Sequence, residues 1–225
     1  MAIPIASDYT NGGIGLKKQS HPSPIAFAHV VLRTTEDNFK PMVDFYVDML
    51  QAEVICEAEE FSMLRYDFEH HRIAIVKMPQ VTPQEASPFT AGLEHTAYTY
   101  ETLTDLAMTY RALKEREKSI TPLWCVNHGM TTSMYYRDPD GNKVGLQVDN
   151  FDTAEEADAF MRGPLFISNP IGTDFDPDEW SGEILSKMRE DGSEGLSAEE
   201  VRRIKTRKEI DARSRVPGFV YGLAN

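Results

Sequence analysis

Residues 135–148 decide the fold, and they read Tyr-Tyr-Arg-Asp-Pro-Asp-Gly-Asn-Lys-Val-Gly-Leu-Gln-Val. The two ends predict strands, and the Asp-Pro-Asp-Gly-Asn sequence between them predicts a tight turn. Gly145 is unusual inside the second strand, because a glycine there packs no side chain and costs backbone entropy on folding. Such a glycine often marks the close approach of a ligand or another backbone.

Around this hairpin the chain repeats one pattern of elements. The first unit opens with the apolar run 27–32 and the second with 93–98, and the third residue of each run is a histidine, His29 or His95. Apolar residues at helical spacing follow each run, and three short β-like stretches come after them. The predicted order is therefore β-α-β-β-β, twice. The expected later strands are 53–57, 62–66 and 72–78 in the first unit, and 121–126, 133–137 and 143–148 in the second.

Each predicted helix has a start signal. Thr34 or Thr35 precedes two acidic residues at the first helix, and Thr102 stands three residues before Asp105 at the second. A hydroxyl at the N-cap followed by an acid is typical of a capped helix start.

The composition divides the chain into four parts. We predict an N-terminal arm (1–24), a first module with its Pro- and Thr-containing linker (25–90), a second module (91–150) and a C-terminal extension (151–225). The extension is rich in Asp, Glu, Gly and Pro, with short helices expected at 154–161 and 198–212, the latter capped by Ser197. We expect it to wrap around its own domain or a dimer partner.

Composition also excludes some classes of protein. The chain has 225 residues, a hydrophobic share of 41% and a formal net charge of −13. That charge argues against a nucleic-acid partner, which a negative surface repels. No run approaches the ~20 apolar residues of a membrane span, and the first residues do not resemble a secretory signal. A cytosolic location is expected, with Cys56 and Cys125 as ordinary buried thiols.

The paired units, both histidines and the 138–142 turn resemble the vicinal oxygen chelate superfamily of glyoxalases, bleomycin resistance proteins and extradiol dioxygenases. Within it, residues 25–150 are most similar to type I extradiol dioxygenases. The resemblance implies an α+β fold in which paired βαβββ modules form a curved, barrel-like mixed sheet around a metal site. The C-terminal extension lies outside the resemblance.

The resemblance also implies metal ligands. These are His29, His95 and the position of Gly145, where the family has a glutamate. Two imidazoles and a carboxylate suit Fe(II), and Mn(II) or another divalent metal is the alternative. Either histidine alone would be taken for a core histidine, but the matching positions in two repeated units favour ligation.

Three further residues resemble catalytic groups of the family. His71 corresponds to an acid/base near dioxygen, His128 to a histidine that hydrogen-bonds a substrate hydroxyl, and Tyr135 to the tyrosine beside it. Such a trio suits the proton transfers that oxygen activation needs. The alternatives are a surface strand end for His71 and a core aromatic for Tyr135.

Gly145 leaves the expected metal site without its carboxylate. Gln147 points the same way, but it is neutral and starts ~7 Å farther along the strand. Metal affinity should therefore fall unless substrate or an exogenous ligand such as chloride or water completes the coordination shell. Chloride fills a similar position in iron halogenases of another fold.

The sequence thus predicts an Fe(II)-dependent, dioxygen-using oxidoreductase that acts on a small aromatic or vicinal-oxygen substrate and forms a homo-oligomer. One alternative is halogenase-type chemistry at position 145. A metal-independent lyase, isomerase or cyclase that uses His71 or His128 is another, and a non-catalytic binding protein is the third. We expect an apolar lining on the strand faces that carry the two metal histidines: Phe27, Val31, Leu93 and Ala97.

Overall fold

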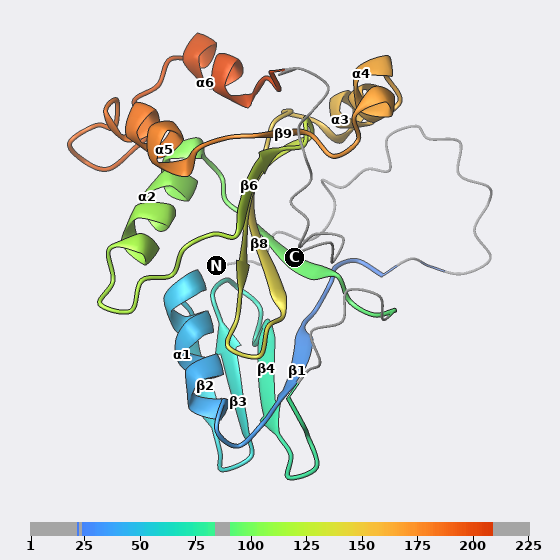
Figure 1. Ribbon diagram of the computed structural model, residues 1–225, viewed down its shortest axis with the longest axis vertical. Coiled ribbons are helices and arrows are strands. Elements are labelled where there is room, and N and C mark those ends of the chain that lie inside the picture. Colours follow the sequence, from blue (N-terminus) through green and yellow to red (C-terminus); the bar gives the residue numbers. More distant parts are fainter. Residues whose placement is uncertain (1–21, 23, 84–90, 209–225) are drawn as a thin grey trace, which may run out of the picture.

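The computed structural model describes residue 22 and residues 24–83 and 91–208, and Figure 1 shows their arrangement. The chain forms two successive βαβββ modules, followed by an extension at the far end of the second module. The first module contains β1 (Val30–Thr34), α1 (Phe39–Leu50), β2 (Glu53–Glu57), β3 (Phe61–Arg65) and β4 (Ile73–Lys77). The second contains β5 (His95–Thr99), α2 (Leu103–Lys114), β6 (Trp124–Asn127), β7 (Thr131–Arg137) and β8 (Lys143–Asp149).

Each module builds its own open, mixed sheet, which confirms the predicted α+β class. The strand orders are β1-β4-β3-β2 and β5-β8-β7-β6-β9, so β1 and β5 lie at sheet edges. In both modules the opening strand is parallel to the closing strand, and the other pairs are antiparallel. Among the described strands, no backbone pairing joins the two sheets.

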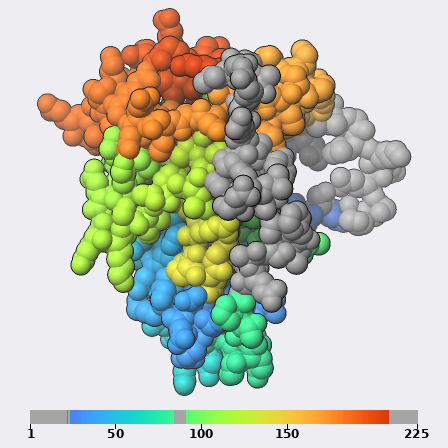
Figure 2. All heavy atoms as spheres, in the orientation of Figure 1, coloured from blue at the N-terminus to red at the C-terminus, as the bar shows by residue number. Residues whose placement is uncertain are grey.

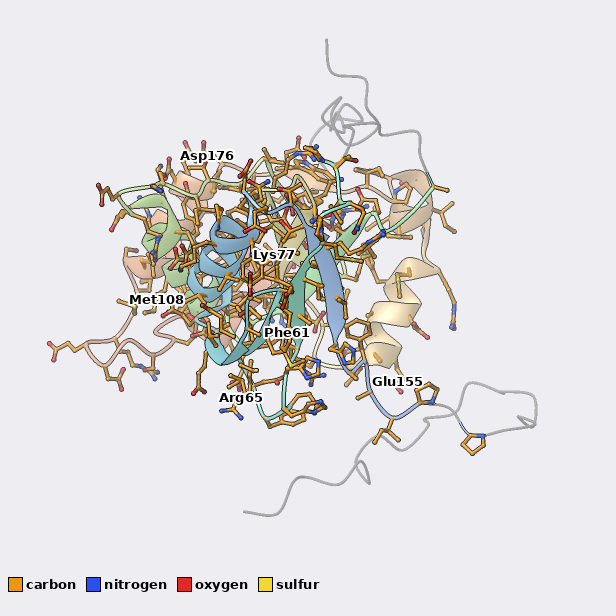
Figure 3. All side chains as sticks on the ribbon, turned by 90° about the horizontal axis from the view of Figure 1, so that it is seen from below. Phe61, Arg65, Lys77, Met108, Glu155 and Asp176 are labelled. Carbon is orange, nitrogen blue, oxygen red and sulfur yellow. The ribbon has the colours of Figure 1, made fainter. Side chains whose placement is uncertain are left out.

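The core forms where α1 and α2 each bury one face against the sheet of their own module. The buried side of α1 carries residues at i, i+3 and i+4 spacing, such as Met42, Tyr46 and Met49. On β1, Leu32 and Thr34 are buried on the core side, whereas Val31, which precedes Leu32, is exposed on the other side. Figure 3, seen from below, shows α1 lying along the first sheet. The opposite face of each sheet is thus left free for a site.

A polar contact locks the two modules together. The Tyr46 hydroxyl on α1 donates a hydrogen bond of 3.0 Å to Asp138, which lies in the β7–β8 turn. Asp138 is buried and also accepts hydrogen bonds from the backbone and side chain of Asn142. Nearby, the Asn38 amide donates to Asp140 at 2.6 Å. The Asp-Pro-Asp-Gly-Asn turn at 138–142 therefore also fixes the contact between the modules.

The extension is part of the same core. It forms α3 (Ala154–Met161), α4 (Pro164–Ser168), β9 (Thr173–Asp174), α5 (Pro177–Leu185) and α6 (Ala198–Lys205). Trp180, Ile184 and Leu196 are buried in the cluster that also contains α2, and Figure 2 shows the extension covering one end of the second module. The predicted helix 154–161 matches α3, while α6 ends at Lys205 and residues 209–212 lie outside the described part.

Three local predictions were wrong, and three short elements were missed. Neither Thr34 nor Thr35 caps α1: the N-cap is Asn38, whose side chain bonds Asp140 instead of the helix backbone. The opening strands begin later than predicted, at Val30 and His95. Before Val30, the Ala28 carbonyl accepts from the Arg72 side chain at 3.0 Å. Cys56 is exposed on the edge strand β2, although Cys125 is buried. The elements α4, β9 and α5 were not predicted.

No helix in the described part of the chain is long and apolar enough to cross a membrane.

Candidate functional site

The second module brings three of the predicted residues together with a tryptophan. The Tyr135 ring stacks on Trp124, with centroids 5.3 Å apart, and meets the edge of the His95 ring at 5.2 Å. These contacts follow from strand register, because Trp124 and Tyr135 are paired across β6 and β7. His95 opens β5, and His128 lies just beyond the end of β6.

His128 is held at both ring nitrogens. Its Nδ1 contacts the Ile171 carbonyl oxygen, and its Nε2 lies 2.9 Å from the Tyr135 hydroxyl oxygen. A carbonyl can only accept, so the proton is on Nδ1 and Nε2 accepts from Tyr135 in the neutral ring. Burial lowers the pKa of His128, which favours this neutral form, although the Ile171 carbonyl raises it. Burial likewise raises the pKa of Tyr135 and keeps its proton in place.

Gly145 lies beneath the Tyr135 ring. The two residues are cross-strand partners in β7 and β8, and Ala97 is the partner on the other side. A Cβ atom built at position 145 would lie 3.2 Å from Tyr135 Cε1 and 3.6 Å from the Ala97 Cβ. The backbone conformation at Gly145 does not require a glycine. A side chain at this position would instead crowd the Tyr135 ring. Gln147 bonds the Thr99 hydroxyl at 3.2 Å.

The first module contributes a pair of histidines. The rings of His29 and His71 stack with centroids 4.5 Å apart. His29 is exposed, whereas His71 is buried and its Nδ1 has no hydrogen-bond partner. Burial, together with the neighbouring His29 and His70, lowers the pKa of His71. His70 is exposed and bonds Glu69, and its ring meets the His71 ring at a steep angle, with centroids 4.5 Å apart.

The structure does not gather all of these residues into one cluster. Ring contacts join His29 to His71 and His95 to Tyr135, but none within the described ranges joins the two groups. The modules do meet nearby, where Tyr66 and Tyr98 contact at 5.6 Å. Across residues 24–83 and 91–208, no three His, Cys, Asp or Glu side chains are arranged to hold a metal ion.

Sequence reasoning missed a carboxylate beside His95. Glu94 contacts Nδ1 of His95 through one oxygen and the Lys143 ammonium through the other. Burial opposes ionisation of Glu94, but Lys143 and His95 outweigh it and lower its pKa. The available signal was that Glu94 directly precedes the histidine; in the structure, Lys143 is the cross-strand partner of His95.

Two of the predicted metal ligands, His95 and His29, have a ring nitrogen that is available for a divalent metal. A carboxylate on one ring nitrogen of a histidine leaves the other nitrogen free to bind a metal, as is usual for ligating histidines. In His95 that free nitrogen is Nε2. His29 makes no hydrogen bond with its ring in the described structure and is likewise available. Two imidazoles of this kind fit Fe(II) or a similar ion, with further ligands left to substrate or solvent.

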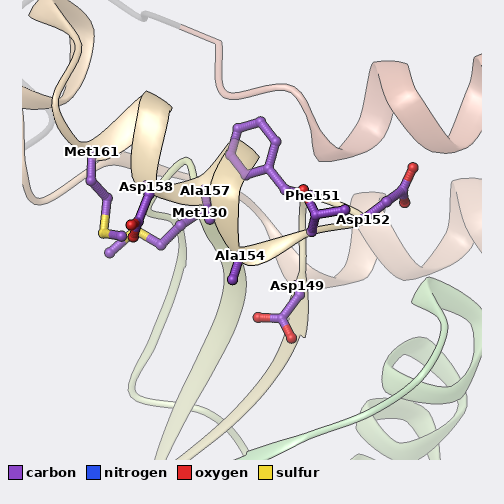
Figure 4. A pocket seen from close by; sticks show the side chains of 9 residues that line it. Met130, Asp149, Phe151, Asp152, Ala154, Ala157, Asp158 and Met161 are labelled. Carbon is purple, nitrogen blue, oxygen red and sulfur yellow. The ribbon is translucent and has the colours of Figure 1, made fainter. Parts of the chain in front are cut away.

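The expected apolar lining lies on an exposed face: Phe27 is 74% exposed, Leu93 70% and Val31 52%. Two surface hollows of about 350 and 340 Å³ lie elsewhere. The first, shown in Figure 4, is lined mainly by α3 and the end of β8, with Asp149, Asp152 and Asp158. Neither hollow is lined by any of the predicted site residues.

Comparison with known proteins establishes the family. Residues 26–146 match the Glyoxalase/Bleomycin resistance protein/Dioxygenase superfamily, and the chain belongs to it. Over 151 residues, 67% of this chain and 77% of the relative, it is 47% identical to biphenyl-2,3-diol 1,2-dioxygenase 2 of Rhodococcus globerulus. Biphenyl-2,3-diol 1,2-dioxygenase 3 of the same organism is 45% identical over 150 residues, with the same coverage of 67% and 77%. The resemblance to extradiol dioxygenases is thus confirmed.

Solved structures are more distant. A glyoxylase/bleomycin resistance protein/dioxygenase domain from Frankia sp. EAN1pec is 16% identical, with 56% of this chain and 99% of that domain covered and a TM-score of 0.45.

Proposed function

We propose that this protein is an oxidoreductase of the extradiol dioxygenase type, which acts on a small aromatic diol with dioxygen. One observation carries the proposal. In a chain 47% identical to a biphenyl-2,3-diol dioxygenase, the Tyr135 hydroxyl donates to His128 while its ring contacts His95. A proton-handling pair next to a predicted metal ligand is the arrangement that a diol substrate needs.

His29 and His95 would hold the metal, which we propose to be Fe(II), with Mn(II) or another divalent ion as the alternative. When bound, Fe(II) would supply the redox chemistry that activates dioxygen toward the diol. Glu94 would keep Nε2 of His95 directed at the ion. With no carboxylate at position 145, the diol oxygens or water would complete the coordination shell.

The remaining residues would bind the diol and move its protons. The Tyr135 oxygen keeps lone pairs to accept a hydrogen bond from a substrate hydroxyl, because its own proton is given to His128. His71, whose Nδ1 has no partner, is available to take up or return a proton on the side of the first module. The Trp124 ring backs Tyr135 and limits its movement.

Chloride-dependent halogenation receives less support. The Tyr135 ring already lies 3.2 Å from where a Cβ of residue 145 would be, so an anion there would share space with an aromatic ring. The metal-independent and non-catalytic alternatives are left to experiment. A homo-oligomer and a cytosolic location also stay predictions.

Oxygen consumption tests the proposed function. Anaerobically purified protein loaded with Fe(II) should consume dioxygen when biphenyl-2,3-diol is added, as measured with an oxygen electrode. The variant His95→Ala should lose both iron and oxygen uptake. His70→Ala is the matched control for iron content alone, since that ring is exposed and bonds Glu69 but also contacts the His71 ring at 4.5 Å.

Two results would contradict the proposal. Diol binding without oxygen uptake by the iron-loaded protein would favour a binding protein. Turnover that survives exhaustive chelation would favour metal-independent chemistry through His71 or His128.

A further inference from the structure

The C-terminal extension reaches the site through an added strand. β9 pairs with β6, with Asp174 opposite Val126 and Thr173 opposite Asn127. Asp174 also accepts a 2.8 Å hydrogen bond from Trp124 Nε1. This pairing places Ile171, two residues before β9, beside His128, which directly follows β6. A segment outside the superfamily match at 26–146 therefore contacts two of the aromatic side chains of the site.

Gly172 permits the close approach of this segment. Its φ is +111°, and a Cβ there would collide with the Asn127 carbonyl oxygen and lie 2.8 Å from His128 Cα. Asn169 closes the loop, since its side chain accepts from the Gly172 N–H at 3.0 Å and donates to the Gly172 carbonyl at 2.9 Å. Only glycine allows the two backbones to lie this near each other.

Arg207 ties the same loop to the backbone of His128. The residue is 8% exposed, and its guanidinium donates to the carbonyl oxygens of Asn169 at 2.6 Å, Leu165 at 2.8 Å and His128 at 3.3 Å. It also lies over the Phe160 ring, 5.4 Å from the centroid. A buried arginine satisfied by several carbonyls fixes their relative positions, because its donors are held in a rigid plane.

The consequence for His128 is a fixed tautomer. The Ile171 carbonyl requires the proton on Nδ1, so the nitrogen that faces Tyr135 is an acceptor. With the proton on Nε2 instead, His128 would donate to Tyr135, and the tyrosine proton would point toward the substrate. The direction of this hydrogen bond therefore depends on the extension.

We propose that residues 169–174 and Arg207 are positioning elements of the active site, which hold His128 in its Nδ1–H form so that Tyr135 presents an acceptor to the substrate. Their effect on turnover rests on the proposed function, whereas their effect on the tautomer of His128 does not. The extension then positions a residue of the active site and also packs against the core.

Histidine NMR tests this in the metal-free, substrate-free protein. Long-range ¹H–¹⁵N correlation spectra at pH 8 should show His128 protonated at Nδ1 alone. Gly172→Ala and Arg207→Ala should each produce a mixture of tautomers. The matched controls are Gly192→Ala, also at positive φ but with nothing within 4 Å of a new Cβ, and Arg203→Ala, whose partner Glu183 is at the surface. Both controls should keep the wild-type spectrum.

Kinetics supply a second measurement. Because His128 orients substrate and does not bind the metal, the KM for biphenyl-2,3-diol should rise by about tenfold in the Arg207→Ala variant, with bound iron per chain unchanged. A wild-type His128 protonated on Nε2 would overturn the inference even if the variants fail to fold. Folded variants with a wild-type spectrum would overturn it too. The predicted spectra without any diol-dependent oxygen uptake would refute the proposed function and leave the positioning of His128 supported.

Discussion

At the residue scale, Gly145 has a different meaning in the sequence and in the structure. From the sequence, the glycine is predicted to stand where the family has a metal-binding glutamate. In the structure it also makes room for the Tyr135 ring, which covers it across the β7–β8 pair. An aromatic ring packed over a strand glycine compensates for the missing side chain. The position therefore has a packing role beside its expected chemical one.

Gly145→Glu should raise metal affinity and lower stability. A carboxylate on the same face as His95 adds a charged ligand, so the affinity for Fe(II) should rise by about tenfold or more, a size that outer-sphere partners already reach. The new side chain must displace the Tyr135 ring, which should cost about 1–3 kcal/mol of unfolding free energy. Gly145→Gln is the control, since it crowds the ring equally without a charge. Equal affinities in the two variants, by calorimetric titration, would show that position 145 does not face the metal.

The buried His128 should make stability depend on pH. Burial lowers its pKa in the folded protein below the ordinary value of 6.5, helped by the charges of His95 and Arg207 and opposed by the Ile171 carbonyl and Asp174. Below about pH 6.5 the unfolded chain therefore binds a proton that the folded chain resists, and the unfolding free energy falls. Above that pH this contribution is constant.

Urea unfolding from pH 8 to pH 5 measures this effect. Wild type should lose more stability over that range than His128→Gln, whose site cannot be protonated. Parallel profiles for the two proteins would mean that His128 titrates alike in the folded and unfolded states.

At the scale of elements, the sequence predicted helices and strands well and their ends less well. The helix that follows the first opening run and the Thr102–Asp105 capping box of α2 are as predicted, because apolar spacing and capping are local signals. The start of α1 was mispredicted because Asn38 is used for a contact with Asp140, which lies 102 residues away. A contact at that separation leaves no local trace in the sequence.

The contact between α1 and the β7–β8 turn should matter for stability. Tyr46→Phe removes the donor to the buried Asp138, and a hydrogen bond to a charged group contributes about 1.5–3 kcal/mol. The control is Tyr66→Phe, since that hydroxyl makes no hydrogen bond in the described structure and the ring contact with Tyr98 is kept. It should change stability by less than about 0.5 kcal/mol. Similar urea midpoints for both variants would show that the hydrogen bond between Tyr46 and Asp138 does not contribute to stability.

At the scale of the whole molecule, the extension and the two modules share one core. Ile184 on α5 is fully buried in the cluster that includes Leu106 and Tyr110 of α2. Next to it, Asp178 accepts from the Tyr110 hydroxyl at 2.8 Å. A chain ending at the superfamily match would expose this surface, so the extension is needed for stability.

Ile184→Ala should therefore destabilise the entire protein. Truncation of a buried isoleucine costs about 2–5 kcal/mol, whereas the control Ile167→Ala, 69% exposed in the same extension, should cost less than about 0.5 kcal/mol. Thermal unfolding should remain a single transition in both variants. A separate early transition in Ile184→Ala would mean that the extension unfolds independently of the modules.

By itself the sequence determined the paired modules, the family and the identity of the candidate site residues, because strand alternation, helical spacing and a turn motif are short-range features. Only the tertiary structure decided which of those residues meet. Strand register placed Tyr135 over Gly145, and a remote segment supplied the Ile171 carbonyl that orients His128. The contact of His128 with Ile171 spans 43 residues of the chain, and both contacts depend on side-chain packing that no local pattern encodes.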